Sequence, residues 1–211
     1  MDARIVYLFV FAALFIIALL LQKRYCIICD ASTASPKPYS YARLQLLWWT
    51  FIVLASFIAT LISSGQIPTL NSSTLILLGI GTLTTASARI IDISDETNYK
   101  TAAIAAANTA ETANPTPAPE PLSKDEKSNG FWLDILSDKT GISIHRFQAF
   151  MFNFIFGLWF IYYTIKQLKD VTYSSSSDIV NGVMPIISDN NLILLGLSAG
   201  TYAALKSTEN K

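Results

Sequence analysis

Five long runs of hydrophobic residues, separated by polar segments, dominate this chain. They cover residues 5–21, 44–62, 74–91, 147–165 and 191–205. An apolar run of about 20 residues has the length that an α-helix needs to cross a bilayer. The last run is shorter, so its helix has to extend upstream, tilt little or be shielded by its neighbours. We therefore predict an all-α integral membrane protein with five transmembrane helices.

The first run has two interpretations. A secretory signal peptide is one, but the run ends in Gln22, Lys23 and Arg24, and no small-residue cleavage pattern follows. We therefore predict a retained transmembrane helix over residues 1–22. Two prolines then interrupt residues 31–39 and prevent a continuous helix there, which indicates a loop.

The two halves of the remaining chain repeat each other. Residues 40–53 align without a gap with residues 143–156, and the run LILLG recurs in residues 74–88 and 191–205. Two matches in the same order, with different spacers, indicate a duplicated helical hairpin. The predicted organisation is a first helix (1–22), a cytoplasmic loop (23–43), a first hairpin (44–91), a cytoplasmic linker (92–142), and a second hairpin with the C-terminal tail (143–211).

The ends of the hairpins and the linker carry local signals. Ser40 and Ser143 stand where an N-cap is expected, because a serine hydroxyl can accept an unpaired backbone N–H. The linker contains an alanine-rich part and a proline-rich part, and then the sequence FWLDILSD. That sequence predicts a short interfacial helix anchored by Phe131 and Trp132. A docking motif for a partner is the alternative.

Small side chains are concentrated in the second helix of each hairpin. Such residues let two helix backbones approach closely, so we expect these helices to pack centrally, with the aromatic spans outside them. The same glycine-rich faces predict a homo-oligomer. The positions predicted for helix packing or pore lining are Gly79, Gly81, Thr82, Thr85, Gly196, Ser198, Gly200 and Thr201.

Charge supports membrane insertion and indicates an orientation. Only 14% of the 211 residues are charged, and the formal net charge is zero, so no basic field suggests nucleic acid as a partner. If the loop, the linker and the C-terminal tail are cytoplasmic, twelve of the fifteen Lys and Arg residues lie inside. The positive-inside rule then predicts an outside N-terminus, a cytoplasmic C-terminus and parallel hairpins.

A matched polar motif opens each hairpin. Arg43 and Gln45 in the first half correspond to Arg146 and Gln148 in the second, with His145 beside them. Paired in space, these side chains would hold an anionic lipid headgroup or a small anionic ligand. The alternative is that the arginines only anchor the helix ends at the interface.

Three further polar residues have alternative interpretations. Asn153 lies well inside a span, where an amide usually bonds to a neighbouring helix; lining a pore is the alternative. Cys26 and Cys29 form a CxxC sequence. This pair can be a redox couple, half of a shared metal site, a lipidation target, or simply two small apolar residues at the membrane edge.

The sequence offers little for catalysis. It has one histidine, no nucleotide-binding or hydrolase motif, and no carboxylate, lysine or histidine at the centre of a span. Proton relays and ion-coupled transport normally need such a residue. We therefore predict a protein that is not an enzyme, without catalytic residues, metal ligands or cofactors.

The motifs Ser40-x-x-Arg43-x-Gln45 and GISIHRFQ (141–148), with the run LILLGLSAGTY (192–202), resemble small bacterial multi-pass membrane proteins of uncharacterised function. The resemblance implies a bacterial inner membrane and a duplicated hairpin, and no mechanism. We expect an anchor, scaffold or sensor that presents its cytoplasmic segment to a soluble partner. A homo-oligomeric channel lined by the small-residue helices is the alternative.

Overall fold

The computed structural model is almost entirely helical. It describes residues 2–109, 117–120, 122, 125–138, 141–173 and 176–208. The long helices are α1 (Ala3–Tyr25), α2 (Tyr41–Ser64), α3 (Ser72–Thr109), α5 (Ile144–Gln167) and α7 (Asp189–Lys206). The short elements are α4 (Phe131–Leu136), β1 (Ser137–Asp138), β2 (Gly141–Ile142), η2 (Leu168–Asp170) and α6 (Ser177–Asn181), with β1 and β2 antiparallel.

Of the described helices, four are long and apolar enough to cross a membrane: Ala3–Tyr25, Tyr41–Ser64, Ser72–Asn108 and Ile144–Asp170. These helices suggest association with a membrane and agree with four of the five predicted spans. The fifth predicted span corresponds to α7, which is not among them. Its 18 residues begin with an aspartate and two asparagines and end with a lysine, which shortens its apolar part.

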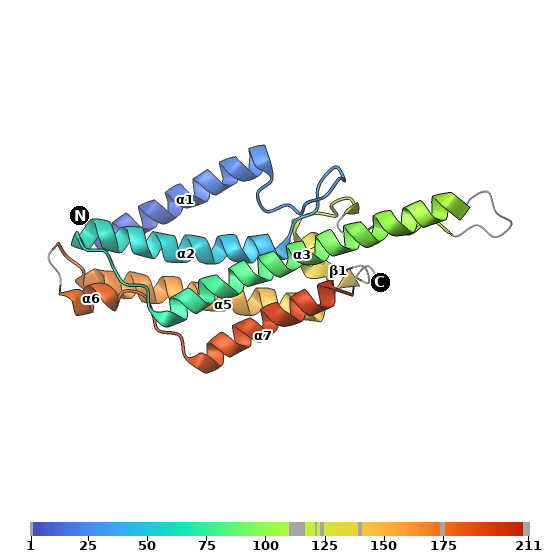
Figure 1. Cartoon of the computed structure of the whole chain (residues 1–211). Helices are drawn as coiled ribbons and strands as arrows, with labels where there is room; N and C mark the ends of the chain where they lie inside the picture. The colour runs from blue at the N-terminus through green and yellow to red at the C-terminus, as the bar shows by residue number, and fades with distance from the viewer. Residues whose placement is uncertain are drawn as a thin grey trace.

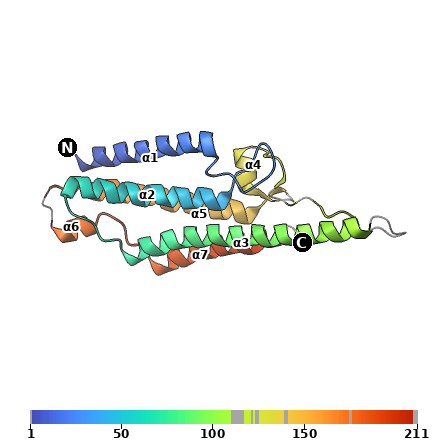
Figure 2. The ribbon, with the colours of Figure 1, turned by 45° about the horizontal axis from the view of Figure 1, so that its top comes forward.

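Helix α2 occupies the centre of the bundle. Both views place α1 on one side of α2, and α3 and α7 on the other (Figures 1 and 2). Helix α5 packs against α2 and α7, and α3 packs against both α2 and α7. The expectation that the small-residue helices are central is therefore wrong within one chain. Tryptophan and other large side chains on α2 bury more surface there than glycine and threonine can.

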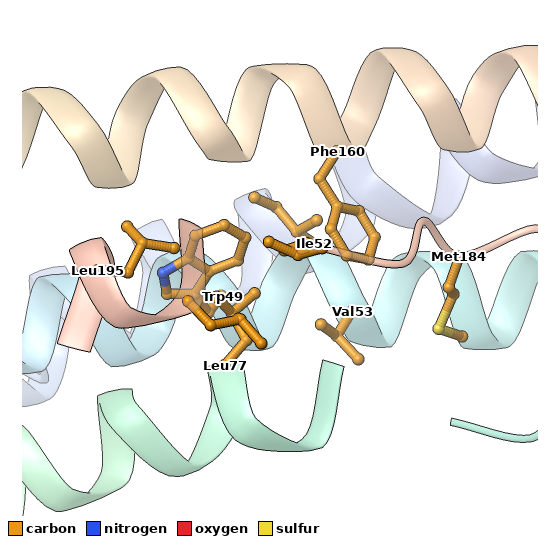
Figure 3. Packing of buried hydrophobic residues seen from close by; sticks show 9 residues of the cluster. Trp49, Ile52, Val53, Leu77, Phe160, Met184 and Leu195 are labelled. Carbon is orange, nitrogen blue, oxygen red and sulfur yellow. The ribbon is translucent and has the colours of Figure 1, made fainter. Parts of the chain in front are cut away.

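The main core lies between α2, α3, α5 and α7 (Figure 3). Trp49 and Phe160 meet edge to face with ring centroids 6.3 Å apart. Burying two such large apolar side chains is a major source of packing energy. The remaining buried members of this cluster are Ile52, Val53, Leu77, Met184, Ile187, Leu192 and Leu195.

The bundle has two chemically different ends. At one end, Thr69 and Asn71 hydrogen-bond to residues 181–185, so the connection between α2 and α3 contacts the connection between α5 and α7. At the other end, the loop 26–40 contacts residues 125–138: the backbone N–H of Tyr39 donates to Asp134, and that of Thr33 donates to Asp125. We call this second end the charged end. The segments that the sequence predicts to be cytoplasmic lie at this end.

Helix α3 differs most from its predicted bounds. The predicted span ends at residue 91, but the helix continues to Thr109. Its 38 residues correspond to about 57 Å, nearly twice the ~30 Å of a hydrocarbon core. Figures 1 and 2 show its second half extending past the other helices at the charged end. We call residues 93–109 the α3 arm.

The two predicted helix starts are confirmed, but in the part of the chain that the structure describes the serines do not cap the helices with their side chains as expected. Ser40 is the N-cap of α2 and Ser143 is the N-cap of α5. Neither side chain makes a capping hydrogen bond within the described residues. The carbonyl oxygens of both serines instead accept the first backbone hydrogen bonds of their helices. The predicted helix over residues 131–138 is confirmed as α4, which ends two residues earlier where β1 begins.

Candidate functional site

A buried lysine joins three distant parts of the chain at the charged end. Lys206 is the last residue of α7, and its Nζ lies 3.2 Å from Asp30 Oδ2 and 3.1 Å from Asp92 Oδ1. The exposed fractions of the three side chains are only 8%, 14% and 5%. A buried charge is strongly unfavourable unless it is paired, so these groups depend on one another. We call them the lysine triad.

The loop before α2 is shaped to deliver Asp30. The backbone N–H of Asp30 donates to Pro38, and that of Ser40 donates to Ile28, so the loop folds back on itself. Burial by itself would raise the pKa of the Asp30 carboxyl. The ammonium of Lys206, with smaller contributions from the Ala31 backbone and Arg43, outweighs burial and holds this pKa below 3.8. Asp30 is therefore a carboxylate at neutral pH.

A polar cavity of about 310 Å³ adjoins the triad. The Arg146 guanidinium lies over the Tyr202 ring, 5.4 Å from its centroid, and Arg146 Nη1 donates to the Ser137 carbonyl at 2.5 Å. Tyr202 in turn packs edge-on against Tyr41, at 5.0 Å. The charged side chains in the lining have both signs: Asp30, Glu126, Lys127, Asp134, Asp138, Arg146 and Lys206. This mixture favours polar or zwitterionic groups over a simple anion.

The five residues of the matched motifs are not brought to one place. Arg146 lines the polar cavity, whereas Arg43 lines a separate cavity between the loop and α2. His145 and Gln148 are exposed, and Gln45 is buried in a third cavity. The motifs are similar in sequence, but the two helices turn them toward different surroundings. A shared anion site built from both arginines stays a prediction without geometric support.

Asn153 forms the helix-to-helix hydrogen bonds that were predicted for it. Its Oδ1 accepts from Trp49 Nε1 at 2.8 Å, and its Nδ2 donates to the Tyr41 hydroxyl at 3.0 Å. Both partners lie on α2, so this amide holds α5 against the central helix. The nearby Trp48 Nε1 also donates to the Asn153 carbonyl at 3.2 Å.

Gln45 lies on α2, one turn from both Tyr41 and Trp49, and its hydrogen bonding contrasts with that of Asn153. Its side chain is 3% exposed, yet neither Nε2 nor Oε1 has a hydrogen-bond partner among the described residues. It lines a cavity of about 200 Å³ between α2, α4 and α5. Aromatic side chains dominate this lining: Tyr41, Trp48, Phe131, Trp132, Phe150 and Phe154, with Leu44 and Asn153. We call it the aromatic cavity.

The predicted small-residue positions have two kinds of environment. Gly81 and Thr85 face α2: a Cβ on Gly81 would lie 3.4 Å from Leu46, and the Thr85 hydroxyl donates to the Ala42 carbonyl. Gly196 faces Ile80 of α3. The exposed positions are Gly79, Thr82, Gly200 and Thr201, while Ser198 is half-buried and donates to its own helix.

Phe131 and Trp132 start α4 as predicted, with different exposures. Phe131 is half-buried and packs edge-on against Tyr39, with centroids 5.4 Å apart. Trp132 is 60% exposed, and its ring also contacts Phe150 of α5. The short helix is thus fixed to the bundle on one side and open on the other. That geometry suits the predicted interfacial anchor.

Cys26 and Cys29, the cysteine pair, are joined by a disulfide, with Cα atoms 5.2 Å apart. This differs from the interpretation as two independent small apolar side chains, and the role as a redox couple stays a prediction. Cys26 ends α1 with φ 52°, and Gln22 Nε2 donates to both sulfur atoms at 3.7 and 3.5 Å. If the loop is cytoplasmic, as the sequence predicts, this disulfide would be transient, because cytosolic reductants keep thiols reduced.

Sequence reasoning missed the lysine triad, because its members were assigned only to polar connections. One signal was present: Asp92 and Lys206 directly follow predicted spans, and Asp30 lies in the loop between two spans on the same predicted side of the membrane. The chain matches no protein-family model, no curated protein and no solved structure. The geometry at the charged end provides a fixed set of buried charges and, among the described residues, three small cavities.

Proposed function

We propose that this protein is a non-enzymatic multi-pass membrane subunit that presents the α3 arm to a soluble cytoplasmic partner. It would act as an anchor, scaffold or sensor in a bacterial inner membrane, with its N-terminus outside and its C-terminus inside. The observation that carries the proposal is the continuity of α3. One helix includes both a membrane-length apolar half and a polar half that projects from the bundle.

The arm has the chemistry of a surface exposed to water. Most of its side chains are exposed, and Lys100 Nζ pairs with Glu96 at 2.8 Å, an i,i+4 ion pair of the kind that supports solvated helices. Asp92 lies at the base of the arm and is held by Lys206. A force or a partner acting on the arm would therefore act on the end of α7 and on the loop that carries Asp30.

The proposal includes five spans arranged as two parallel hairpins, α2 with α3 and α5 with α7. Its support is that corresponding helices also contact one another, α2 with α5 and α3 with α7. A reporter fused at residue 118 tests the orientation, because some reporters are active only outside the inner membrane and others only inside. Activity of the external reporter at this position would contradict the proposal.

The arm itself is tested by purification in mild detergent. We expect that replacing residues 97–109 with a glycine and serine segment of equal length abolishes recovery of the partner. The matched control is Thr101→Ala, which removes one hydroxyl and leaves the helix intact. Thr101→Pro breaks the helix but leaves the other residues of the arm unchanged, and it is expected to behave like the replacement. Equal partner recovery with all four chains would exclude the arm as a binding surface.

A homo-oligomeric channel is the second candidate. The observation in its favour is an open face: in the described structure, a Cβ on Gly79 or Gly200 would meet no atom within 4 Å. Thr82 and Thr201 lie on the same helices and are exposed, so copies that meet there would place hydroxyls between them. Single-channel recording after reconstitution separates the candidates. Silence at all voltages and tensions would count against the channel.

A further inference from the structure

The aromatic cavity contains a buried amide whose hydrogen bonds are not made. Both polar atoms of the Gln45 side chain are buried, and neither bonds to a described residue. An amide in an apolar site is unfavourable unless it is paired. Asn153 lines the same cavity, but its side-chain amide is already hydrogen-bonded to Trp49, Tyr41 and the Ala149 carbonyl. Gln45 therefore has no partner within the part of the chain that the structure describes, and a group from outside the protein can supply one.

The size and lining of the cavity limit what that partner can be. Its walls are almost entirely aromatic and aliphatic, and an apolar cavity of this kind does not hold a cluster of water. Its volume of about 200 Å³ is below that of pockets that take drug-sized molecules, ~300 Å³ and above. It opens to the surface beside Trp132 and Phe154, which are 60% and 41% exposed. A thin apolar chain that enters from the bilayer fits these conditions.

The amide specifies the polar end of that chain. Nε2 of Gln45 donates and Oε1 accepts, so a complementary group must accept and donate at one point. A protonated carboxyl or a hydroxyl does both, whereas an ester carbonyl only accepts. Among the residues that the structure describes, no cationic side chain lines this cavity, which disfavours an ionised carboxylate. The neighbouring polar cavity shares Tyr41 with this one but contains the charged groups.

We propose that the aromatic cavity binds a single-chain lipid with a neutral end group, such as a protonated fatty acid, hydrogen-bonded to the side chain of Gln45. The end group sits between α2 and α5, and the first part of the chain lies against Trp48 and Phe150. The rest of the chain leaves past Trp132 into the bilayer. This site is independent of the α3 arm and of the orientation of the protein.

The test uses the full chain in phosphatidylcholine nanodiscs and a palmitic acid analogue with a diazirine in its chain. After irradiation, mass spectrometry locates the label. We expect label on the cavity residues of α2 and α5 in excess of label on the lipid-exposed residues of α1. Competition with hexadecanol, which donates and accepts, should exceed that with methyl palmitate, which only accepts, by roughly three- to tenfold.

Gln45→Leu should abolish the difference between the two competitors, because it removes the amide and keeps the approximate volume. The matched control is Gln148→Leu, the equivalent and exposed residue of the second half, which should retain the difference. Competition is also measured on the unaltered protein, so the test does not depend on the folding of a variant. The proposal is overturned if label follows exposure alone, if both competitors are equal, or if a diazirine phospholipid labels the cavity as strongly as the fatty acid.

Discussion

Removing the buried ammonium of Lys206 should destabilise the protein by several kcal/mol. The substitution Lys206→Met preserves most of the side-chain volume but leaves Asp30 and Asp92 as two buried carboxylates that share one site. Breaking a buried ion pair by removing one partner typically costs about 3–5 kcal/mol. That is a large part of the roughly 5–15 kcal/mol by which proteins are stable. The loss of stability arises from the two carboxylates, Asp30 and Asp92, which stay buried without the ammonium of Lys206.

This reasoning predicts a rescue. If the two remaining carboxylates are the cause, adding Asp30→Asn and Asp92→Asn to Lys206→Met should restore most of the lost free energy of unfolding. The control is Lys100→Met in the α3 arm. Its ion pair with Glu96 is shorter, at 2.8 Å, but exposed, so its removal should cost less than about 0.5 kcal/mol.

The assay is denaturant titration in mixed micelles, followed by tryptophan fluorescence. If Lys206→Met costs no more than Lys100→Met, or if the neutral triple variant is less stable than Lys206→Met alone, the triad is not the buried charge cluster described above. The pH dependence gives a second check. The folded pKa of Asp30 is lowered, so its contribution is present above about pH 4 and is lost as pH falls through the folded pKa. Asp30→Asn should reduce this acid sensitivity.

Three further predictions concern other parts of the bundle. In lipid-free micelles, Gln45→Leu should raise the free energy of unfolding by roughly 1–3 kcal/mol, because it removes an unpaired buried amide. An unchanged midpoint of thermal unfolding would contradict this prediction. Gly157→Ala should cost about 1–3 kcal/mol, since its Cβ would lie 2.6 Å from Cε2 of the Trp48 indole and closer still to Nε1. Gly79→Ala, where the Cβ would meet open space, should be neutral or stabilising in the same titration. If the loop is cytoplasmic, the cysteine pair in cells quenched with acid should accept two maleimide labels without added reductant; a pair that labels only after reduction would place the loop outside.

The membrane class and most helix positions follow from the sequence, because they depend on local properties. The length and polarity of a run determine whether it crosses a bilayer, and four of the five predicted spans are helices of sufficient length and hydropathy. Ser40 and Ser143 mark helix starts for a similarly local reason. The α3 arm could also have been predicted from the sequence, because residues 92–109 contain neither glycine nor proline to interrupt a helix.

The partners of polar side chains were decided only by the tertiary structure. Gln45 and Asn153 both interrupt apolar helices, yet Asn153 has partners on the next helix, whereas Gln45 faces the aromatic cavity with no partner among the described residues. Lys206 meets Asp30 from 176 positions away. Hydrophobic burial is nearly independent of direction, so composition along the chain predicts it. A hydrogen bond or ion pair requires a particular rotation of each helix about its axis, which is set only when the helices pack together.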